Sequence, residues 1–113
     1  MSREQFTRTE RLLGGEAMDK LAASRVAVFG VGGVGGYVVE ALARSGIGTL
    51  DLIDNDVVCE SNLNRQIIAL HSTLGQYKVD VAARRAKDIN PDITVNTHKL
   101  FYTPETAGQL DFR

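Results

Sequence analysis

Residues 25–36 read RVAVFGVGGVGG, and this stretch decides the fold class. Its first six residues, 25–30, form a short apolar run rich in valine, which is typical of a strand buried in a parallel sheet. A G-x-G-x-x-G pattern, residues 30–35, follows the run directly and precedes a helical pattern. The stretch therefore predicts the first strand-turn-helix of a Rossmann-like unit.

The sequence on both sides continues this alternation of strands and helices. Asn90-Pro91 ends one helical pattern, and Thr103-Pro104 resembles the start of a further helix. The order β-α-β-α-β predicts an α/β fold, a Rossmann-like parallel sheet with right-handed crossovers, preceded by short N-terminal helices. Apolar spacing and turn residues place helices at about 3–13, 15–23, 33–46 and 75–90, and strands at 25–30, 49–54 and 93–98.

Composition narrows the possible classes of protein. The 113 residues are 43% hydrophobic and 24% charged, which favours a single globular domain spanning 1–113. The net charge of −1 gives no overall electrostatic attraction for nucleic acid or anionic membrane. No stretch approaches the roughly 20 apolar residues of a membrane span, and the start is charged rather than signal-like. Cys59 is the only cysteine, so an internal disulfide is excluded and a cytoplasmic location is expected.

The glycine loop predicts a nucleotide phosphate site. Gly30 allows the tight turn, Gly32 lets the backbone approach a phosphate, and Gly35 lets helix and strand pack closely. The helix N-terminus adds unpaired N–H groups that favour an anion. Asp54, at the end of the next strand, is placed to accept ribose hydroxyls. The loop alone would favour NAD, but the additional Gly33 and the long polar segment after Asp54 oppose it.

That polar segment separates the alternatives. Residues 54–66 read DNDVVCESNLNRQ, and GQYK follows at 75–78. The combination G-x-G-G-x-G, D-x-D-x-V-x-x-x-N-x-x-R-Q and G-x-x-K resembles the ubiquitin-activating-enzyme-like (ThiF/MoeB/HesA) adenylyltransferases. The resemblance extends from Phe6 to Thr97, and its combined motifs are far more specific than a glycine loop.

Adenylation explains these residue types. A carboxylate is joined to the α-phosphate of ATP with loss of pyrophosphate, so two anions must meet and positive charge must surround the triphosphate. Arg65 offers a planar fork of donors and Lys78 a mobile point charge. The resemblance implies that Asn62, Arg65 and Lys78 contact ATP and that Asp54 holds the ribose. Asn62 and Gln66 are suited to hold phosphate oxygens or orient the arginine, and Asp56 belongs to the same motif.

The resemblance also implies partners. An aromatic-x-Arg near the family's N-terminus reaches the ATP of a partner subunit, and Phe6-Thr7-Arg8 matches it, so Arg8 is a candidate trans-acting residue in a homodimer. An aspartate after the family's fourth strand binds Mg²⁺. No position before residue 113 matches that aspartate, so no metal ligand is assigned. The chain is expected to be truncated at its C-terminal side and, by itself, to bind ATP weakly and not to turn over.

Within the family, two stretches favour one branch. FTRTERLLG at 6–14 and NRQIIAL at 64–70 look most like the enzymes that cyclise and dehydrate threonylcarbamoyladenosine in tRNA. The alternative is adenylation of the C-terminus of a ubiquitin-like sulfur carrier, as in thiamine or molybdopterin synthesis. An NAD-dependent oxidoreductase and a non-catalytic dimerisation half are the other two hypotheses. Arg65 and Lys78 oppose both, because neither needs a triphosphate site.

Overall fold

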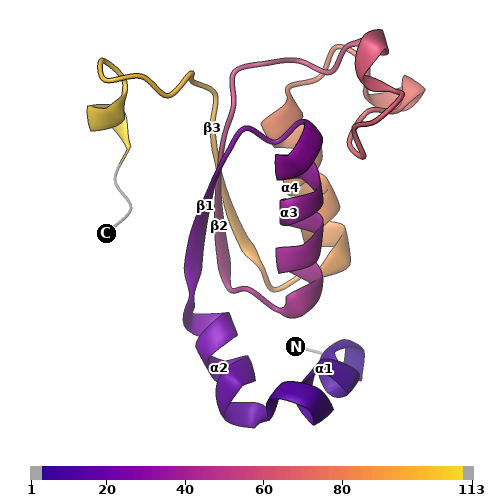
Figure 1. Cartoon of the computed structure of the whole chain (residues 1–113), viewed down its shortest axis with the longest axis vertical. Helices are drawn as coiled ribbons and strands as arrows, with labels where there is room; N and C mark the ends of the chain where they lie inside the picture. Colours follow the sequence, from indigo (N-terminus) through magenta and orange to yellow (C-terminus); the bar gives the residue numbers. More distant parts are fainter. Residues whose placement is uncertain (1–3, 111–113) are drawn as a thin grey trace.

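A computed structural model describes residues 4–110 and shows three parallel strands with two long helices on one face (Figure 1). The predicted β-α-β-α-β order and α/β class are confirmed. In chain order, the elements are η1 (Glu4–Phe6), α1 (Thr7–Leu13), α2 (Gly15–Ala23), β1 (Arg25–Phe29), α3 (Gly33–Ser45), β2 (Thr49–Ile53), η2 (Glu60–Asn62), η3 (His71–Thr73), α4 (Lys78–Ile89), β3 (Thr94–His98) and η4 (Ala107–Gln109).

The sheet has the order β1-β2-β3, so the central strand is β2. Four of its five residues are buried, whereas β1 and β3 are more exposed. The register pairs Phe29 with Ile53 and Ile53 with His98. All three strands therefore end side by side, and the loops that follow them share one edge of the sheet.

The core lies between this sheet and helices α3 and α4. Leu50 and Leu52 alternate along β2 with Asp51, and both leucines are fully buried. Each such side chain contributes about 1.5–3 kcal/mol to folding. The helices add small and branched residues to the same core: Val39, Ala43, Val79, Ala82 and Ala86.

The other face of the sheet carries a polar network centred on the fully buried Asp51. Arg25 donates from Nε at 2.5 Å and from Nη2 at 3.0 Å to its carboxylate. Asn96 Nδ2 donates at 3.2 Å, and His98 Nε2 lies 3.2 Å from the same Oδ1. The Arg25 guanidinium lowers the pKa of Asp51, against the opposing effect of burial. The network thus joins all three strands.

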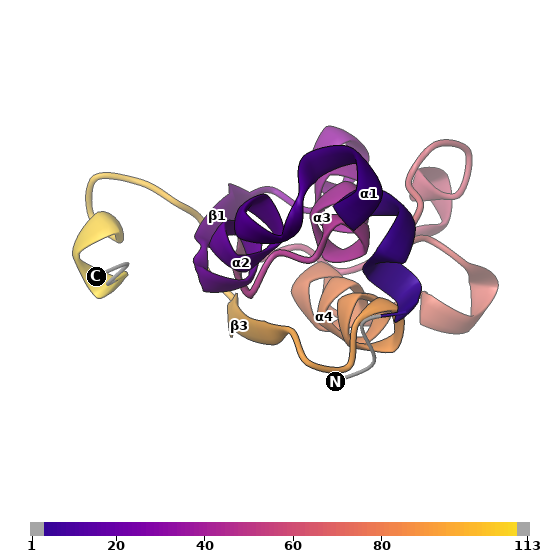
Figure 2. The same ribbon diagram turned by 90° about the horizontal axis from the view of Figure 1, so that it is seen from below.

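The N-terminal helices lie at the opposite end of the strands from the glycine loop (Figures 1 and 2). Phe6 is buried close to Gly46, the residue that ends α3 in a left-handed conformation. Gln5 Nε2 donates to the carbonyl oxygen of Ile89 at 2.9 Å, at the C-terminal end of α4. The first predicted helical residue, number 3, lies outside the described residues.

Two differences from the sequence prediction have a clear physical reason. Helix α4 begins at Lys78 rather than near 75, because residues 75–77 pair with the loop after β2: Val57 forms a bridge with Tyr77, and Gly75 donates to Val58. The helix predicted after Thr103-Pro104 is wrong. Only turns and the short η4 form in the described part of this segment. Gly108 disfavours a longer helix, and the residues of the segment are half-exposed or exposed, so they offer no apolar face to pack.

Within residues 4–110, no helix is both long and apolar enough to cross a bilayer.

Candidate functional site

A crevice of about 410 Å³ opens where the three strands end. Ligands of open α/β sheets bind at this edge, outside the carboxyl ends of the strands. The predicted residues Gly30, Asp54 and Asp56 line it, as does Asn55. Its remaining walls are apolar and come from Phe29, Ile53 and the segment after β3: Leu100, Phe101 and Tyr102.

The glycine loop has the geometry that its sequence predicts. Gly30 has φ +84°, which favours glycine, and its N–H donates to Ile53 O at 2.8 Å. A Cβ on Gly35 would lie 1.6 Å from Gly30 O, so helix and strand approach each other too closely for any side chain. Around Gly33, the first residue of α3, there is open space. The loop therefore presents bare backbone at a helix N-terminus, a suitable surface for a phosphate.

Asp54 organises the loops on both sides of it. Its Oδ2 accepts the N–H of Val31 at 3.0 Å, and its Oδ1 accepts the N–H of Asp56 at 2.8 Å. These bonds hold the glycine loop against the end of β2. Each carboxylate oxygen keeps further acceptor capacity, so the same group can still receive ribose hydroxyls from the crevice.

Gln66 and Asn62 lie inside the polar loop, and both are buried. Asn62 Oδ1 accepts the N–H of Cys59 at 2.9 Å, so its oxygen already holds the loop in shape. Gln66 is 8% exposed and touches Gly32: a Cβ there would lie 3.0 Å from its Nε2. In the described part of the chain, Gln66 Oε1 has no hydrogen-bond partner. A buried unpaired oxygen costs about 1–3 kcal/mol, which a ligand or ordered water beside Gly32 would recover.

The two predicted cationic side chains differ in their exposure and in their polar partners. Lys78, the first residue of α4, is only 7% exposed, and its Nζ lies 3.9 Å from Asp56 Oδ2. Its backbone N–H also donates to Asp56 O at 3.0 Å. This places Lys78 next to a wall of the crevice. Arg65 is exposed, and its Nη1 donates to Ser61 O and to Asn64 Oδ1. Its guanidinium keeps further donors for an anion.

Arg8 is not brought together with these residues. It is exposed in α1, beside a shallow hollow lined by Glu4, Gln5, Thr7 and Arg11. The N-terminal helices and the glycine loop lie at opposite ends of the strands (Figure 1). Within one chain Arg8 is therefore remote from the crevice, as a residue that acts on a partner's site would be.

The apolar part of the crevice was not predicted. Phe29 and Tyr102 meet edge to face, with ring centroids 4.8 Å apart, and Phe101 is exposed beside them. Aromatic rings of this kind offer a stacking surface for a nucleobase. Ligands of open α/β sheets bind outside the carboxyl ends of the strands, and this rule is the signal that could have identified the segment after the strand predicted at 93–98. The sequence alone does not show which side chains of that segment face the crevice.

Metal ligands are sparse in this region. Within residues 4–110, no three His, Cys, Asp or Glu side chains lie together as a metal site. The exposed Cys59 places its Sγ 3.5 Å from Val57 O. The crevice lining offers backbone, carboxylate, amide and aromatic groups for a nucleotide, and Lys78 lies beside it.

The sequence profile of the ThiF family matches residues 6–111. The chain belongs to the ThiF family. It is 52% identical over 106 residues to the tRNA threonylcarbamoyladenosine dehydratase of Bacillus subtilis, covering 94% of this chain and 42% of the relative. Its structure matches that of the Escherichia coli tRNA N6-threonylcarbamoyladenosine dehydratase in complex with ATP with a TM-score of 0.92 and 45% identity, over 95% of this chain and 44% of that one.

The chain is also similar, at lower identity, to a protein of another name. The probable adenylyltransferase/sulfurtransferase MoeZ of Mycobacterium tuberculosis is 38% identical over 115 residues, covering 97% of this chain and 29% of the relative. The chain thus spans less than half the length of each of these relatives.

Proposed function

We propose that this ThiF-family protein uses ATP to adenylate a carboxylate, and that the carboxylate belongs to threonylcarbamoyladenosine in tRNA. The observation that carries the nucleotide part is the crevice at the carboxyl ends of the strands: Gly30, Asp54 and Asp56 line it, and the buried Lys78 lies 3.9 Å from Asp56 Oδ2. The higher identity to the dehydratases, 52% against 38% for the sulfurtransferase-type relative, supports the tRNA part.

The residues present fit ATP. Bare backbone at Gly32 and Gly33 would receive phosphate oxygens, and Asp54 would hold the ribose. Beside Gly32, the Nε2 amide of Gln66 would donate to a phosphate oxygen, and the unpaired Oε1 would accept from an ordered water. ATP supplies an α-phosphorus that a carboxylate oxygen can attack with loss of pyrophosphate. Arg65 and Lys78 would bring the positive charge that this meeting of anions needs.

The remaining parts of the proposal concern metal, assembly and location. Mg²⁺ would accompany the triphosphate, since it is bound through phosphate oxygens with one or two carboxylates. A homodimer would bring Arg8 of one protomer to the crevice of its partner, in keeping with the distance that separates them within one chain. A cytoplasmic location agrees with a tRNA substrate.

The second candidate substrate is the C-terminus of a ubiquitin-like sulfur carrier. The 38% identity to an adenylyltransferase/sulfurtransferase supports it, less strongly than the dehydratases support tRNA. Both reactions would use the same ATP site, so the crevice does not distinguish them.

Pyrophosphate release by the native full-length protein with ATP and Mg²⁺ distinguishes the two substrates. The proposal predicts release that depends on tRNA carrying threonylcarbamoyladenosine, with unmodified tRNA as the matched control. Release that requires a sulfur-carrier protein instead would replace the first substrate by the second. No release with either would contradict the adenylation itself.

A further inference from the structure

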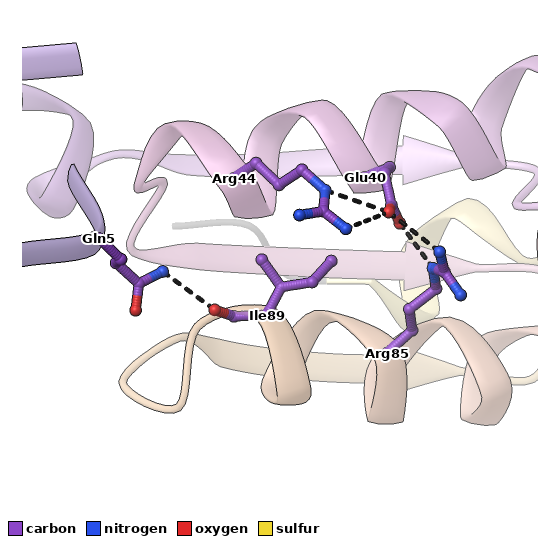
Figure 3. A network of polar contacts seen from close by, with 5 residues as sticks. All are labelled: Gln5, Glu40, Arg44, Arg85 and Ile89. Atoms are coloured by element: carbon purple, nitrogen blue, oxygen red, sulfur yellow. Dashed lines mark hydrogen bonds and ion pairs between the residues drawn. The ribbon is translucent and has the colours of Figure 1, made fainter. Parts of the chain in front are cut away.

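Glu40 joins the two long helices through a cluster of charged side chains (Figure 3). It lies on α3, and its carboxylate accepts two hydrogen bonds from Arg85 on α4: from Nε at 2.7 Å and from Nη2 at 3.1 Å. Arg44, one turn further along α3, donates to the same carboxylate from Nε at 3.1 Å and from Nη2 at 2.8 Å. Arg85 therefore bridges the helices, whereas Arg44 acts within one helix.

Both helices begin near the crevice that Gly30 and Asp56 line. Helix α3 starts at Gly33, inside the glycine loop, and α4 starts at Lys78. The distance between the phosphate-binding backbone and the Lys78 amine therefore depends on how these helices sit side by side. The residues that the two helices bury in the core are small or branched and apolar, such as Val39, Ala43 and Ala82, and the hydrophobic effect that favours their burial is not directional.

The bridge between Glu40 and Arg85 is directional. A bidentate arginine-carboxylate pair fixes orientation as well as distance. The Glu40 side chain is only 14% exposed, and that of Arg85 is 38% exposed, so the pair is partly shielded from water. The Arg85 guanidinium lowers the pKa of Glu40, which keeps the carboxylate ionised at neutral pH.

We infer that Glu40 and Arg85 are positioning residues for the phosphate site: their pair sets the place of Lys78 relative to the glycine loop. They lie along the helices, away from the crevice lining, and act through α3 and α4. The inference rests on the proposed ATP site. A purely structural role would make the pair stabilise the fold without changing what Lys78 contributes to ATP binding.

The test is a double-mutant cycle on the native full-length protein, with ATP affinity measured by titration calorimetry. Arg85→Ala should weaken ATP binding about tenfold. Arg44→Ala is the matched control: it removes an arginine from the same carboxylate but leaves the bridge, and its ATP affinity should stay within about twofold of wild type. Lys78→Ala combined with Arg85→Ala should bind ATP no more weakly than Lys78→Ala alone.

The outcomes of this cycle separate failure of the inference from failure of the proposed ATP site. Equal ATP affinity for wild type and Arg85→Ala, or additive effects of Lys78→Ala and Arg85→Ala, would overturn the inference alone. A wild type that does not bind ATP would overturn the proposed function and the inference together. If Arg85→Ala does not fold, Arg85→Lys and Glu40→Gln serve in the same cycle. The lysine variant should recover part of the affinity, because it restores a cation but not the bidentate geometry.

Discussion

Gly35 is the residue whose identity the fold restricts most narrowly. A Cβ there would lie 1.6 Å from the carbonyl oxygen of Gly30, a backbone atom that cannot move aside as a side chain does. Gly33, two residues earlier in the same helix, has no atom within 4 Å of the place where its Cβ would be. The two glycines of this motif thus differ: Gly35 serves packing, whereas Gly33 has open space that the proposed nucleotide would occupy.

Alanine at these two positions should separate the two roles. Gly35→Ala should lower the free energy of unfolding by about 1–3 kcal/mol or more, because the added methyl overpacks the turn. Gly33→Ala should leave stability unchanged or slightly higher, since alanine favours helix, yet lower the affinity for ATP. Urea denaturation and nucleotide titration measure the two effects. Equal loss of stability in both variants would contradict this division.

Gln66 gives a second test at a single residue. Its buried Oε1 has no partner among the described residues, so Gln66→Met, which keeps the shape and removes the polar group, should not destabilise the nucleotide-free protein. Thermal unfolding should show an unchanged or higher Tm, while ATP binding weakens. A marked drop in Tm would show that the amide is satisfied within the folded chain and does not await a ligand.

Some of the single-residue features were predictable from the sequence, and others were not. The glycine loop follows β1 and Asp54 follows β2, as the sequence predicts, because both positions depend on local strand and turn patterns. The hydrogen bond from the Cys59 N–H to Asn62 Oδ1 could not be predicted. A motif gives the residue type but does not show which side-chain atoms already form hydrogen bonds within the loop. The pairing of Phe29 with Tyr102 was missed for a related reason: it joins residues 73 positions apart.

Among the elements, the three strands depend on one another through Asp51. Arg25 on β1 and Asn96 and His98 on β3 all contact its carboxylate, so the ionised form is favoured in the folded protein. The pKa of Asp51 is lowered below its ordinary value of 3.8, so its contribution to stability is present above about pH 4 and is lost as the pH falls through the lowered value.

This sign predicts an acid-dependent loss of stability that Asp51→Asn should reduce. Wild type should lose free energy of unfolding below about pH 4, and the variant, less stable at pH 7, should lose less over the same range. Asp92→Asn, at an exposed position in the turn before β3, is the matched control and should keep the wild-type slope. Urea denaturation between pH 2.5 and about 7 measures the slopes. Identical slopes for all three proteins would exclude Asp51 as a source of the pH dependence.

Elements that bury an apolar face were predictable, and those decided by distant pairing were not. Strands and helices α3 and α4 follow from local periodicity, because each has a face in the core. The start of α4 depends on a bridge between Val57 and Tyr77 that spans the polar loop, so periodicity placed it three residues early. The segment after Thr103 has a helix-like beginning but no core to join, and only a 3-10 turn forms.

In the whole molecule, helix α1, which carries Arg8, lies at the end of the sheet opposite the loops that follow the strands and line the crevice. Because of this separation, the proposed contact of Arg8 with ATP requires the crevice of a partner subunit. The chain also spans less than half the length of these relatives.

Mixing inactive subunits tests the proposed dimer. Arg8→Ala and Lys78→Ala proteins should each be nearly inactive alone. After equal mixing and exchange, about a quarter of wild-type activity should appear, because half of the dimers are mixed and each mixed dimer has one intact site. Pyrophosphate release measures the recovery. Mixtures as inactive as their components, with exchange shown independently, would count against action of Arg8 on the partner.

The glycine loop and Lys78 are proposed to form a triphosphate site and not a dinucleotide site. Calorimetric titration of the native full-length protein with ATP and Mg²⁺, and separately with NAD, distinguishes the two. We expect that ATP binds, that NAD does not compete, and that Lys78→Ala weakens ATP binding at least about tenfold. Lys87→Ala, at an exposed position on the same helix, should leave ATP binding unchanged. NAD binding as tight as that of ATP, or unchanged ATP affinity in Lys78→Ala, would contradict it.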